Sequence, residues 1–527
     1  MNHRHFLLKA AAAIMLSVPF ATGAEDLVIL HTNDTHSLID PDKDGRGGVL
    51  QRKAIIDSVR KAEKNVILVD AGDMVQGTLY FKYFKGDVEY PLMNMLGYDI
   101  RILGNHEFDN GMKELAKRYK DVKAHRLSAN YDFSGTELQG MFDPYVIKKA
   151  GGKRIGFIGI NVDPESLISK ENIEGVKFKD VIKTANETAA FLKDKKKCDL
   201  VVVVSHIGAV KENDKATDYD LAKASRDIDI IIGGHSHTVI EPGNKGKYPS
   251  VVENAAGRPV LIAQTGKYGK KLGYIKIDLD ALKKTTPAQF DYELIDITDR
   301  FPADRLDKSI KGFIAPYKHM VDSVNNRVIG RSLHDLDSDD RNGGYANWAA
   351  DYARWFGQLV LDSINGRDGM PQRLDIGVMN VGGIRQNMPK GDVTESQILA
   401  TFPFANHMVI TAVKGADIMD ALKVAAKKGG EGISGNVRVV VDKDHNLKRV
   451  VVDGREMDPE KTYTVATIDY VAAGNDDLAG FGRGKLLWRD NAEMAVPMMR
   501  YINHLTGLGL PIAPDMTGRF QEEITIP

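Results

Sequence analysis

A single pattern recurs through the first half of this 527-residue chain: a short run of apolar, mostly β-branched residues ends abruptly in polar residues and glycine. The runs cover residues 27–30, 66–69, 100–103, 201–204 and 228–232. Continuous apolar runs of this length are typical of strands that are covered on both faces. The pattern therefore predicts a layered α/β domain whose functional groups lie at the ends of its strands.

The rest of the chain predicts a second domain, because 527 residues are too many for one ordinary globular domain. Other segments of the first half look like helices (50–64, 181–196) or strands (259–264, 272–279). The second half mixes expected helices (345–361, 416–427) with expected strands (376–379, 408–413, 437–441, 450–452, 463–467), as in an α+β domain. We expect a signal peptide at 1–24, a catalytic domain at 25–300, a linker helix at 301–327 and a specificity domain at 328–527.

The first 24 residues have the order of a secretory signal peptide. Arg4 and Lys9 form a basic start, residues 7–20 are apolar, and small residues follow at 21–24. A membrane anchor is the less favoured alternative, because the apolar run is shorter than the ~20 residues that span a bilayer. We expect a soluble mature chain that begins near Glu25 and is secreted to the periplasm or the extracellular space.

Net charge and cysteine content exclude several classes of function. The formal net charge is -1, so no global charge attracts the chain to nucleic acid or to an anionic membrane. We expect a small-molecule substrate, no nucleic acid and no obligate protein partner. Cys198 is the one cysteine, so neither an intramolecular disulfide nor a thiolate-rich metal site is expected.

The residues at the strand ends suit a metal site. They are Asp34, His36, Asp73, Asn105, His206, His235 and His237. Nitrogen and oxygen ligands without thiolate suit zinc, manganese, iron or cobalt. Seven ligands are too many for one tetrahedral ion but suit two ions if Asp73 bridges them. A single histidine after a strand is more often a hydrogen-bonded loop residue, but five successive strand ends with such residues favour a site.

Five sequence blocks resemble those of the 5'-nucleotidase family of calcineurin-like metallophosphoesterases, of the bacterial periplasmic 5'-nucleotidase and UDP-sugar hydrolase type. The blocks are HTNDTH at 31–36, DAGD at 70–73, GNHEFD at 104–109, SHIG at 205–208 and GGHSH at 233–237. The resemblance extends through the second half of the chain. It implies a four-layer α/β/β/α metallophosphoesterase domain followed by a smaller α+β 5'-nucleotidase C-terminal domain.

The resemblance also implies two metal centres, with zinc or manganese favoured. One centre would use Asp34, His36, Asp73 and His237, and the other Asp73, Asn105, His206 and His235. Relatives often have Gln or Asn in place of His237. His106 would be the catalytic residue, oriented by Asp109 three positions later.

The expected mechanism follows from the charge of phosphate esters. Two cations would neutralise the phosphoryl oxygens and lower the pKa of bound water, which supplies a hydroxide that attacks phosphorus in line. Protonated His106 would stabilise the phosphoryl charge or protonate the leaving oxygen. No covalent enzyme intermediate is required.

Four segments of the second half resemble the family's substrate site. Arg341 and Arg385 offer forked donors for phosphate, and the motif at 380–385 has Val381 where relatives have glycine. The substrate residues implied by the resemblance are Arg341, Asn380, Gly383, Arg385, Phe404, Tyr470 and Asp476. On this match, Tyr470 stacks on the nucleobase and Asp476 contacts the nucleoside.

Two departures weaken the expected nucleobase site. The loop at 474–478 reads GNDDL where relatives have Gly-Gly-Asp-Gly-aromatic. His407 and Met408 occupy a stretch in which relatives often have a second aromatic residue, although a methionine can pack against a ring. The base preference therefore stays open, whereas hydrolysis of a phosphate ester does not depend on it.

The leading hypothesis is hydrolysis of nucleoside 5'-phosphates, with nucleoside diphosphates, nucleotide sugars or dinucleotides as further candidate substrates. One alternative is another esterase of the same family, such as a 2',3'-cyclic-nucleotide phosphodiesterase, and a more remote one is a thiosulfohydrolase on the same scaffold. A non-catalytic nucleotide-binding surface protein is a different class. It is disfavoured because every expected ligand and the His106–Asp109 pair are present.

Overall fold

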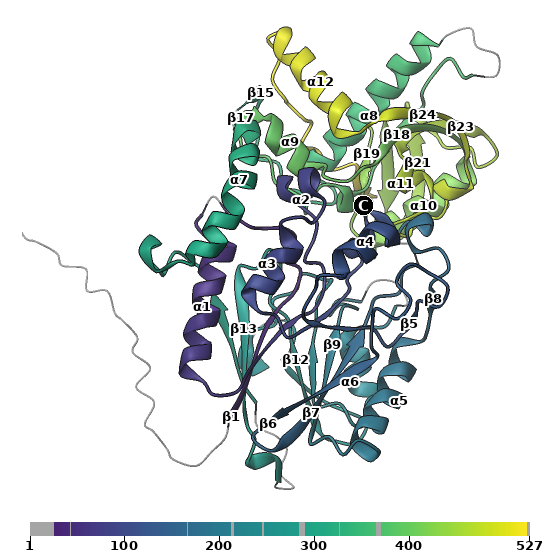
Figure 1. Ribbon diagram of the computed structural model, residues 1–527. Coiled ribbons are helices and arrows are strands. Elements are labelled where there is room, and N and C mark those ends of the chain that lie inside the picture. Colours follow the sequence, from purple (N-terminus) through teal and green to yellow (C-terminus); the bar gives the residue numbers. More distant parts are fainter. Residues whose placement is uncertain are drawn as a thin grey trace, which may run out of the picture.

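A computed structural model describes residues 26–42, 44–165, 167–211, 215–244, 247–283, 290–325, 327–364 and 370–523. The predicted signal peptide at 1–24 lies outside these ranges. Two domains are stacked in Figure 1, with the first half of the chain below and the second half above. No helix in the described ranges has the length and apolar character needed to cross a membrane.

The first domain contains two six-stranded sheets. One has the order β14–β13–β1–β2–β3–β4, with β1 (Asp26–Thr32), β2 (Val66–Asp70), β3 (Ile100–Ile102), β4 (His125–Leu127), β13 (Lys271–Asp278) and β14 (Phe290–Asp296). The other has the order β11–β12–β10–β9–β7–β6, with β6 (Tyr145–Ala150), β7 (Lys153–Ile160), β9 (Leu200–Ser205), β10 (Ile230–Ile232), β11 (Val251–Glu253) and β12 (Pro259–Ala263). Strands β1 to β4 are parallel, as are β7, β9, β10 and β12.

The two sheets pack face to face between layers of helices. Leu27 of β1 and Val202 of β9 belong to one core between the sheets. Leu30, on the opposite face of β1, packs in the core that contains Ile56 of a covering helix. The helices on that side are α1 (Val49–Ala62), α2 (Leu79–Phe84), α3 (Glu89–Leu96) and α4 (Gly111–Tyr119), and α5 (Val181–Asp194) and α6 (Asp218–Ala224) cover the second sheet. The expected α/β/β/α arrangement is therefore confirmed.

The second domain is a mixed α+β structure. Its five-stranded sheet has the order β19–β16–β23–β18–β24, with β16 (Ile376–Met379), β18 (His407–Lys414), β19 (Gly432–Ile433), β23 (Thr462–Ile468) and β24 (Lys485–Glu493). Smaller sheets contain β15 (Val328–Ser332) with β17 (Gly391–Thr394), and β20 (Val437–Val441), β21 (Leu447–Val452), β22 (Arg455–Glu456) and β25 (Phe520–Glu522). The helices are α8 (Gly344–Ser363), α9 (Glu395–Thr401), α10 (Gly415–Lys427), α11 (Asp469–Ala472) and α12 (Ala495–Gly507).

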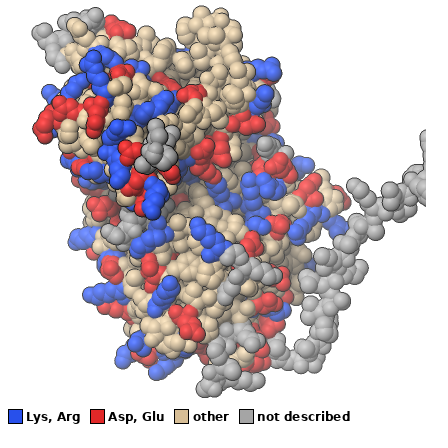
Figure 2. All heavy atoms as spheres, turned by 180° about the vertical axis from the view of Figure 1, so that it is seen from behind, with Lys and Arg blue, Asp and Glu red and all other residues tan. Residues whose placement is uncertain are grey.

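A long helix, α7 (Lys308–Asn325), lies between the two halves of the chain and packs against α2 and α9. It falls within the predicted linker at 301–327, while the exact domain bounds stay a prediction. In the back view, Lys and Arg side chains alternate with Asp and Glu over the described surface (Figure 2). That mixture agrees with the near-zero net charge of the chain.

The elements predicted from the sequence are present with shifts of a few residues at their ends, except that the helix expected from residue 301 begins at Lys308. The edge strand β14 was not predicted, because it lies in a polar, charged segment of the sequence and only one of its residues is buried. Strand β6 and its partner β7 were not predicted. Strand β6 lies at the edge of its sheet, is partly exposed and carries two lysines. Edge positions tolerate polar residues, which hides such strands from a search for apolar runs.

We predict that Gly273→Ala destabilises the first domain. Gly273 of β13 lies opposite the fully buried His31 of β1, and a Cβ atom there would lie 1.9 Å from His31 Nε2. Such overpacking should lower the free energy of unfolding by about 1–3 kcal/mol, measurable by urea denaturation. Gly312→Ala, in an open part of α7, is the control and should stabilise the helix by up to ~1 kcal/mol. Equal stabilities of the two variants would contradict this packing.

Candidate metal centre and substrate pocket

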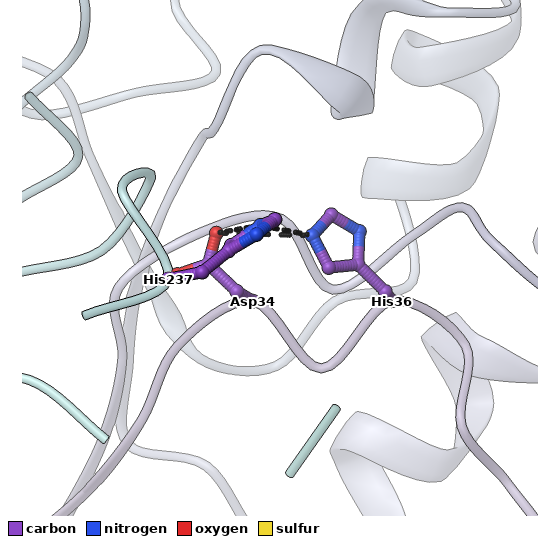
Figure 3. Close-up of side chains that lie close together, drawn as sticks. All are labelled: Asp34, His36 and His237. Atoms are coloured by element: carbon purple, nitrogen blue, oxygen red, sulfur yellow. Dashed lines mark hydrogen bonds and ion pairs between the residues drawn. The ribbon is translucent and has the colours of Figure 1, made fainter. Parts of the chain in front are cut away.

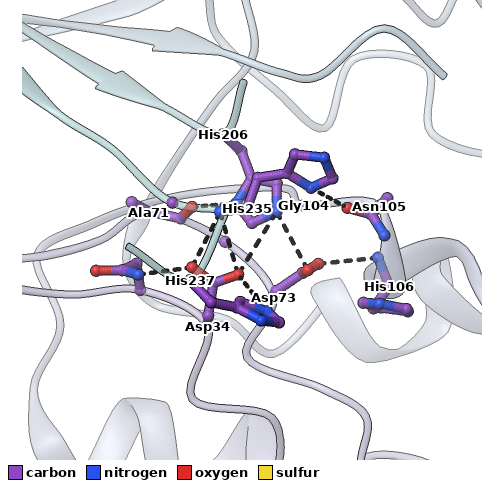
Figure 4. Close-up of polar contacts among 12 residues, drawn as sticks. Asp34, Ala71, Asp73, Gly104, Asn105, His106, His206, His235 and His237 are labelled. Atoms are coloured by element: carbon purple, nitrogen blue, oxygen red, sulfur yellow. Dashed lines mark hydrogen bonds and ion pairs between the residues drawn. The ribbon is translucent and has the colours of Figure 1, made fainter. Parts of the chain in front are cut away.

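The candidate metal ligands follow the carboxyl ends of parallel strands in both sheets. Five of the seven adopt a left-handed backbone conformation, with φ between 44° and 70°: Asp34, His36, Asp73, His235 and His237. Such φ values are uncommon outside glycine and indicate tight turns that direct side chains to one place. The structure brings all seven candidates together at this edge of the domain (Figure 3 for His36, Figure 4 for the other six).

Asp34, His36 and His237 form the first cluster (Figure 3). His36 Nε2 lies 3.0 Å from His237 Nε2, and His237 Nε2 lies 3.5 Å from Asp34 Oδ1. His36 Nδ1 donates to the carbonyl oxygen of Gln76 at 3.0 Å, which leaves the Nε2 lone pair directed at the cluster. Two imidazole nitrogens and a carboxylate that converge in this way fit a divalent cation.

Asp73, His206 and His235 form the second cluster. His206 Nδ1 donates to the carbonyl oxygen of Ala71 at 2.6 Å, whereas the buried Nε2 makes no hydrogen bond and faces Asp73 Oδ2 at 3.2 Å. Asn105 Oδ1 lies 3.0 Å from His235 Nδ1 and joins this group. An unsatisfied buried nitrogen beside a carboxylate also fits a cation.

Two carboxylates lie between the clusters. Asp73 Oδ2 is 3.2 Å from His206 Nε2 and 4.0 Å from His36 Nε2. Asp34 Oδ1 is 3.9 Å from His206 Nε2. The described residues therefore fit two adjacent cations, and Asp73 is placed where a bridging ligand would be.

The electrostatics of the site favour positive charge at its centre. Burial lowers the pKa of His206, but the Asp73 and Asp34 carboxylates outweigh it and raise that pKa to about 10. Burial lowers the pKa of His235 to about 3 and those of His36 and His237 well below their usual value. Neutral imidazoles beside carboxylates are competent metal ligands.

His106 and Asp109 lie beside the two clusters, on and just after the short 3-10 helix η1 (His106–Phe108). His106 Nδ1 lies 2.9 Å from Asp109 Oδ2, and the His106 backbone N–H donates to Asp73 Oδ1 at 2.9 Å. Burial opposes the charge of His106, yet the Asp109 and Asp73 carboxylates raise its pKa. The geometry expected of an oriented acid–base histidine is present.

Glu107 is a supporting residue that the sequence search missed. Its carboxylate accepts backbone N–H groups of Gly104 at 2.5 Å, Met74 at 3.0 Å and Asp73 at 3.1 Å. Arg101 Nη2, fully buried, lies 3.5 Å from it. One carboxylate thus holds the two turns that carry Asp73 and His106. The sequence feature that could have indicated this role of Glu107 was the presence of a carboxylate inside the GNHEFD block.

Two substrate candidates from the second domain reach the metal clusters. Arg385 Nη2 lies 3.4 Å from His36 Nε2. The Phe404 ring lies 5.7 Å from the His106 ring and 6.0 Å from the Arg385 guanidinium. Residues that are far apart in the sequence therefore share one site between the domains.

Three further candidates cluster around Asp476. Its carboxylate accepts from Asn380 Nδ2 at 2.5 Å and lies 3.3 Å from the Tyr470 hydroxyl. The Tyr470 hydroxyl also lies 3.3 Å from the carbonyl oxygen of Leu167 in the first domain. A Cβ at Gly383 would lie 2.8 Å from Asn380 Oδ1, so Gly383 permits this close approach. The stacking role of Tyr470 stays a prediction.

Two cavities adjoin the clusters on different sides. One of about 470 Å³ is walled by His235 and by Phe178, Asp163 and Lys215 of the first domain. The other, of about 210 Å³, lies between the domains beside His237. Both therefore border a candidate metal ligand.

We predict that Glu107→Ala weakens the fold beneath the metal site. The change leaves three buried N–H groups without their acceptor, which should cost about 3 kcal/mol or more of unfolding free energy. Glu114→Ala on α4, whose carboxylate makes partly exposed ion pairs with Arg118 and Lys117, should change it by less than about 1 kcal/mol. Urea denaturation of the EDTA-treated variants measures both. A Glu107 variant as stable as the Glu114 variant would refute this role.

Comparison with known proteins agrees with this geometry. A family model described as calcineurin-like phosphoesterase matches residues 27–239, and one described as 5'-nucleotidase, C-terminal domain, matches residues 328–483. The 5'-nucleotidase of Rattus norvegicus is 28% identical over 98% of this chain and 94% of its own length. That of Homo sapiens is 29% identical over 83% of this chain and 78% of its own length.

A solved structure shows the same fold. The 5'-nucleotidase precursor from Thermus thermophilus matches with a TM-score of 0.81 and 27% identity, over 95% of this chain and 100% of that one. Together the two family models cover most of the chain, in the order in which its two domains fold. The chain therefore belongs to the 5'-nucleotidase family of calcineurin-like metallophosphoesterases and is a metal-dependent hydrolase of phosphate esters.

Proposed function

We propose that this protein is a secreted two-metal phosphohydrolase that cleaves nucleoside 5'-phosphates. The observation that carries the proposal is the meeting of the two domains at the metal clusters. Arg385 and Phe404 of the second domain lie beside His36 and His106 of the first. A phosphate bound at the clusters would thus lie next to residues suited to hold a nucleotide.

In this proposal the two centres have the ligands expected from the sequence. One comprises Asp34, His36, Asp73 and His237, and the other Asp73, Asn105, His206 and His235. Zinc or manganese suits this donor set. Bound divalent cations would neutralise phosphoryl charge and make a bound water acidic enough to act near neutral pH.

The side chains around the centres have separate tasks. His106 Nδ1–H donates to Asp109 at 2.9 Å, and the nearby carboxylates raise the pKa of the ring. The doubly protonated ring then also carries a proton on Nε2, which it donates to the leaving oxygen. Arg385 offers N–H groups to the phosphoryl oxygens. Together they place opposite charge where negative charge develops, with no covalent bond to the protein.

The nucleoside would bind on the second domain. Asp476 offers a carboxylate for ribose hydroxyl groups, and Tyr470 offers a ring for the base. Arg341 Nη1 donates a hydrogen bond to the buried Glu431 at 2.7 Å. Arg341 would contribute positive charge to the substrate site from the same side. Asn380 and Gly383 would shape the loop that carries Arg385.

Larger substrates are a second candidate, supported by the cavity of about 470 Å³ beside His235. Its size lies in the ~300–1,000 Å³ range of ligand pockets. A nucleotide sugar or dinucleotide needs such space, because the attacked phosphorus carries a second organic group. A 2',3'-cyclic-nucleotide phosphodiesterase and a non-catalytic nucleotide-binding protein stay as alternatives for the test below.

Secretion is proposed from residues 1–24, with the mature chain beginning near Glu25 in the periplasm or outside the cell. A small-molecule substrate agrees with the absence of a strong net charge. No nucleic acid or protein partner is proposed.

We predict that phosphate release depends on bound metal ions and on the nucleoside part of the substrate. EDTA-treated protein should release no phosphate from AMP, and zinc or manganese should restore release, because bound cations would neutralise phosphoryl charge and acidify the attacking water. Ribose 5-phosphate should be cleaved less efficiently than AMP, since it lacks the base that Tyr470 would stack. Phosphate release from a panel with cyclic nucleotides and nucleotide sugars, each metal added in turn, measures this. Equal kcat/KM for AMP and ribose 5-phosphate would exclude base stacking.

We predict that His106→Ala lowers kcat by about 10²–10⁴-fold, the usual contribution of a positioned acid. Its metal content should be unchanged, because His106 is not among the proposed ligands. His125→Ala, at an exposed position of β4, is the matched histidine control and should retain full activity. Turnover and metal analysis of both variants check this. Near-normal turnover of the His106 variant would remove it from the mechanism.

A further inference from the structure

The pocket of about 210 Å³ between the domains combines residues from both sides of the molecule. His237, Lys267 and Tyr268 line it from the metal-bearing domain, and Arg341 and Arg385 line it from the second domain. Its volume is below the ~300 Å³ at which the usual range of small-molecule pockets begins. It therefore suits a group as small as a phosphoryl group.

Positive charge dominates the pocket. Lys267, Arg341 and Arg385 face one carboxylate in its wall, that of Asp339. Arg341 is engaged by the buried Glu431 at 2.7 Å. Lys267 Nζ lies 3.4 Å from Asp339, whose side chain is 73% exposed, and such exposed pairs are weak. Of the two pocket cations with a described ion pair, Lys267 and Arg341, Lys267 thus has the weaker one.

Tyr268 fixes Lys267 relative to both domains. The Tyr268 backbone N–H donates to the carbonyl oxygen of Asp34 at 2.6 Å, and its hydroxyl donates to the carbonyl oxygen of Arg385 at 2.8 Å. The Lys267 ammonium lies 5.3 Å from the centre of the Tyr268 ring. The segment therefore connects a metal-ligand turn, the second-domain arginine and the lysine between them.

We propose that Lys267 is a phosphate-binding residue and that this pocket binds a phosphoryl group, either of the substrate or as released inorganic phosphate. The inference rests on the proposed function and adds a cation from the metal-bearing domain to the expected arginines. Ammonium and guanidinium groups together form charge-assisted hydrogen bonds to phosphate oxygens. Such a site requires both domains, since neither alone supplies all three cations.

Lys267→Met tests this, because it removes the charge while keeping much of the side chain. Lys270→Met is a matched control: Lys270 lies 5.7 Å from the same ring with similar exposure, but it pairs with Asp42 at 2.7 Å and does not line the pocket. Measurements on the metal-restored full chain are KM and kcat for AMP, inhibition by inorganic phosphate, and metal content. Lys267→Arg should retain binding.

Loss of one charge-assisted hydrogen bond should raise KM, the inhibition constant of phosphate, or both by about tenfold or more. Metal content and kcat should change little, and Lys270→Met should change all values less than about twofold. A rise in KM alone assigns the pocket to the substrate, and a rise in the inhibition constant alone assigns it to released phosphate. Unchanged values for Lys267→Met, or an equal effect of Lys270→Met, would overturn the proposal.

Failure of the proposed function is a separate result. If the wild-type chain cleaves no nucleotide, calorimetric titration with inorganic phosphate still tests the pocket. Weaker phosphate binding by Lys267→Met than by Lys270→Met would uphold the inference, and equal binding would end it.

Discussion

The carboxylate of Asp34 joins the two sheets of the first domain at the point on which the site depends. It follows β1 of one sheet and accepts the backbone N–H of His235, which follows β10 of the other, at 3.0 Å. The sheets share an apolar core, so their strand ends meet at one edge. This hydrogen bond fixes the two turns there, and the two candidate metal clusters lie between them.

The second domain supplies further residues to the candidate site of the first domain. Helix α7 packs against α2 and α9, which belong to different domains, and so holds the two halves in contact. Lys82 of α2 adds an ion pair with Glu493 and donates to the carbonyl oxygen of Pro403, next to Phe404. Contacts outside the site therefore help to place Phe404 beside His106.

Strand ends were predictable because an apolar run and the polar residues after it are adjacent in sequence. Asp34, His36 and the later histidines could be grouped for that reason. The same pattern predicted a layered α/β domain, whereas the four-layer arrangement was implied by the family resemblance. Glu107 and Lys267 escaped notice because their partners are set by turns and by domain packing. The Glu107 carboxylate accepts hydrogen bonds from backbone N–H groups that lie 33 and 34 residues earlier in the chain. No local sequence pattern encodes such a contact.

The left-handed backbone at five candidate ligand positions limits which residues the site can accept during evolution. Asp, Asn and His tolerate positive φ better than most side chains, and β-branched residues tolerate it poorly. The residue types that fit the turns are thus also those that bind borderline metals. At His237, exchange with asparagine could retune the choice of metal while the turn stays intact, whereas a valine there would disturb both at once.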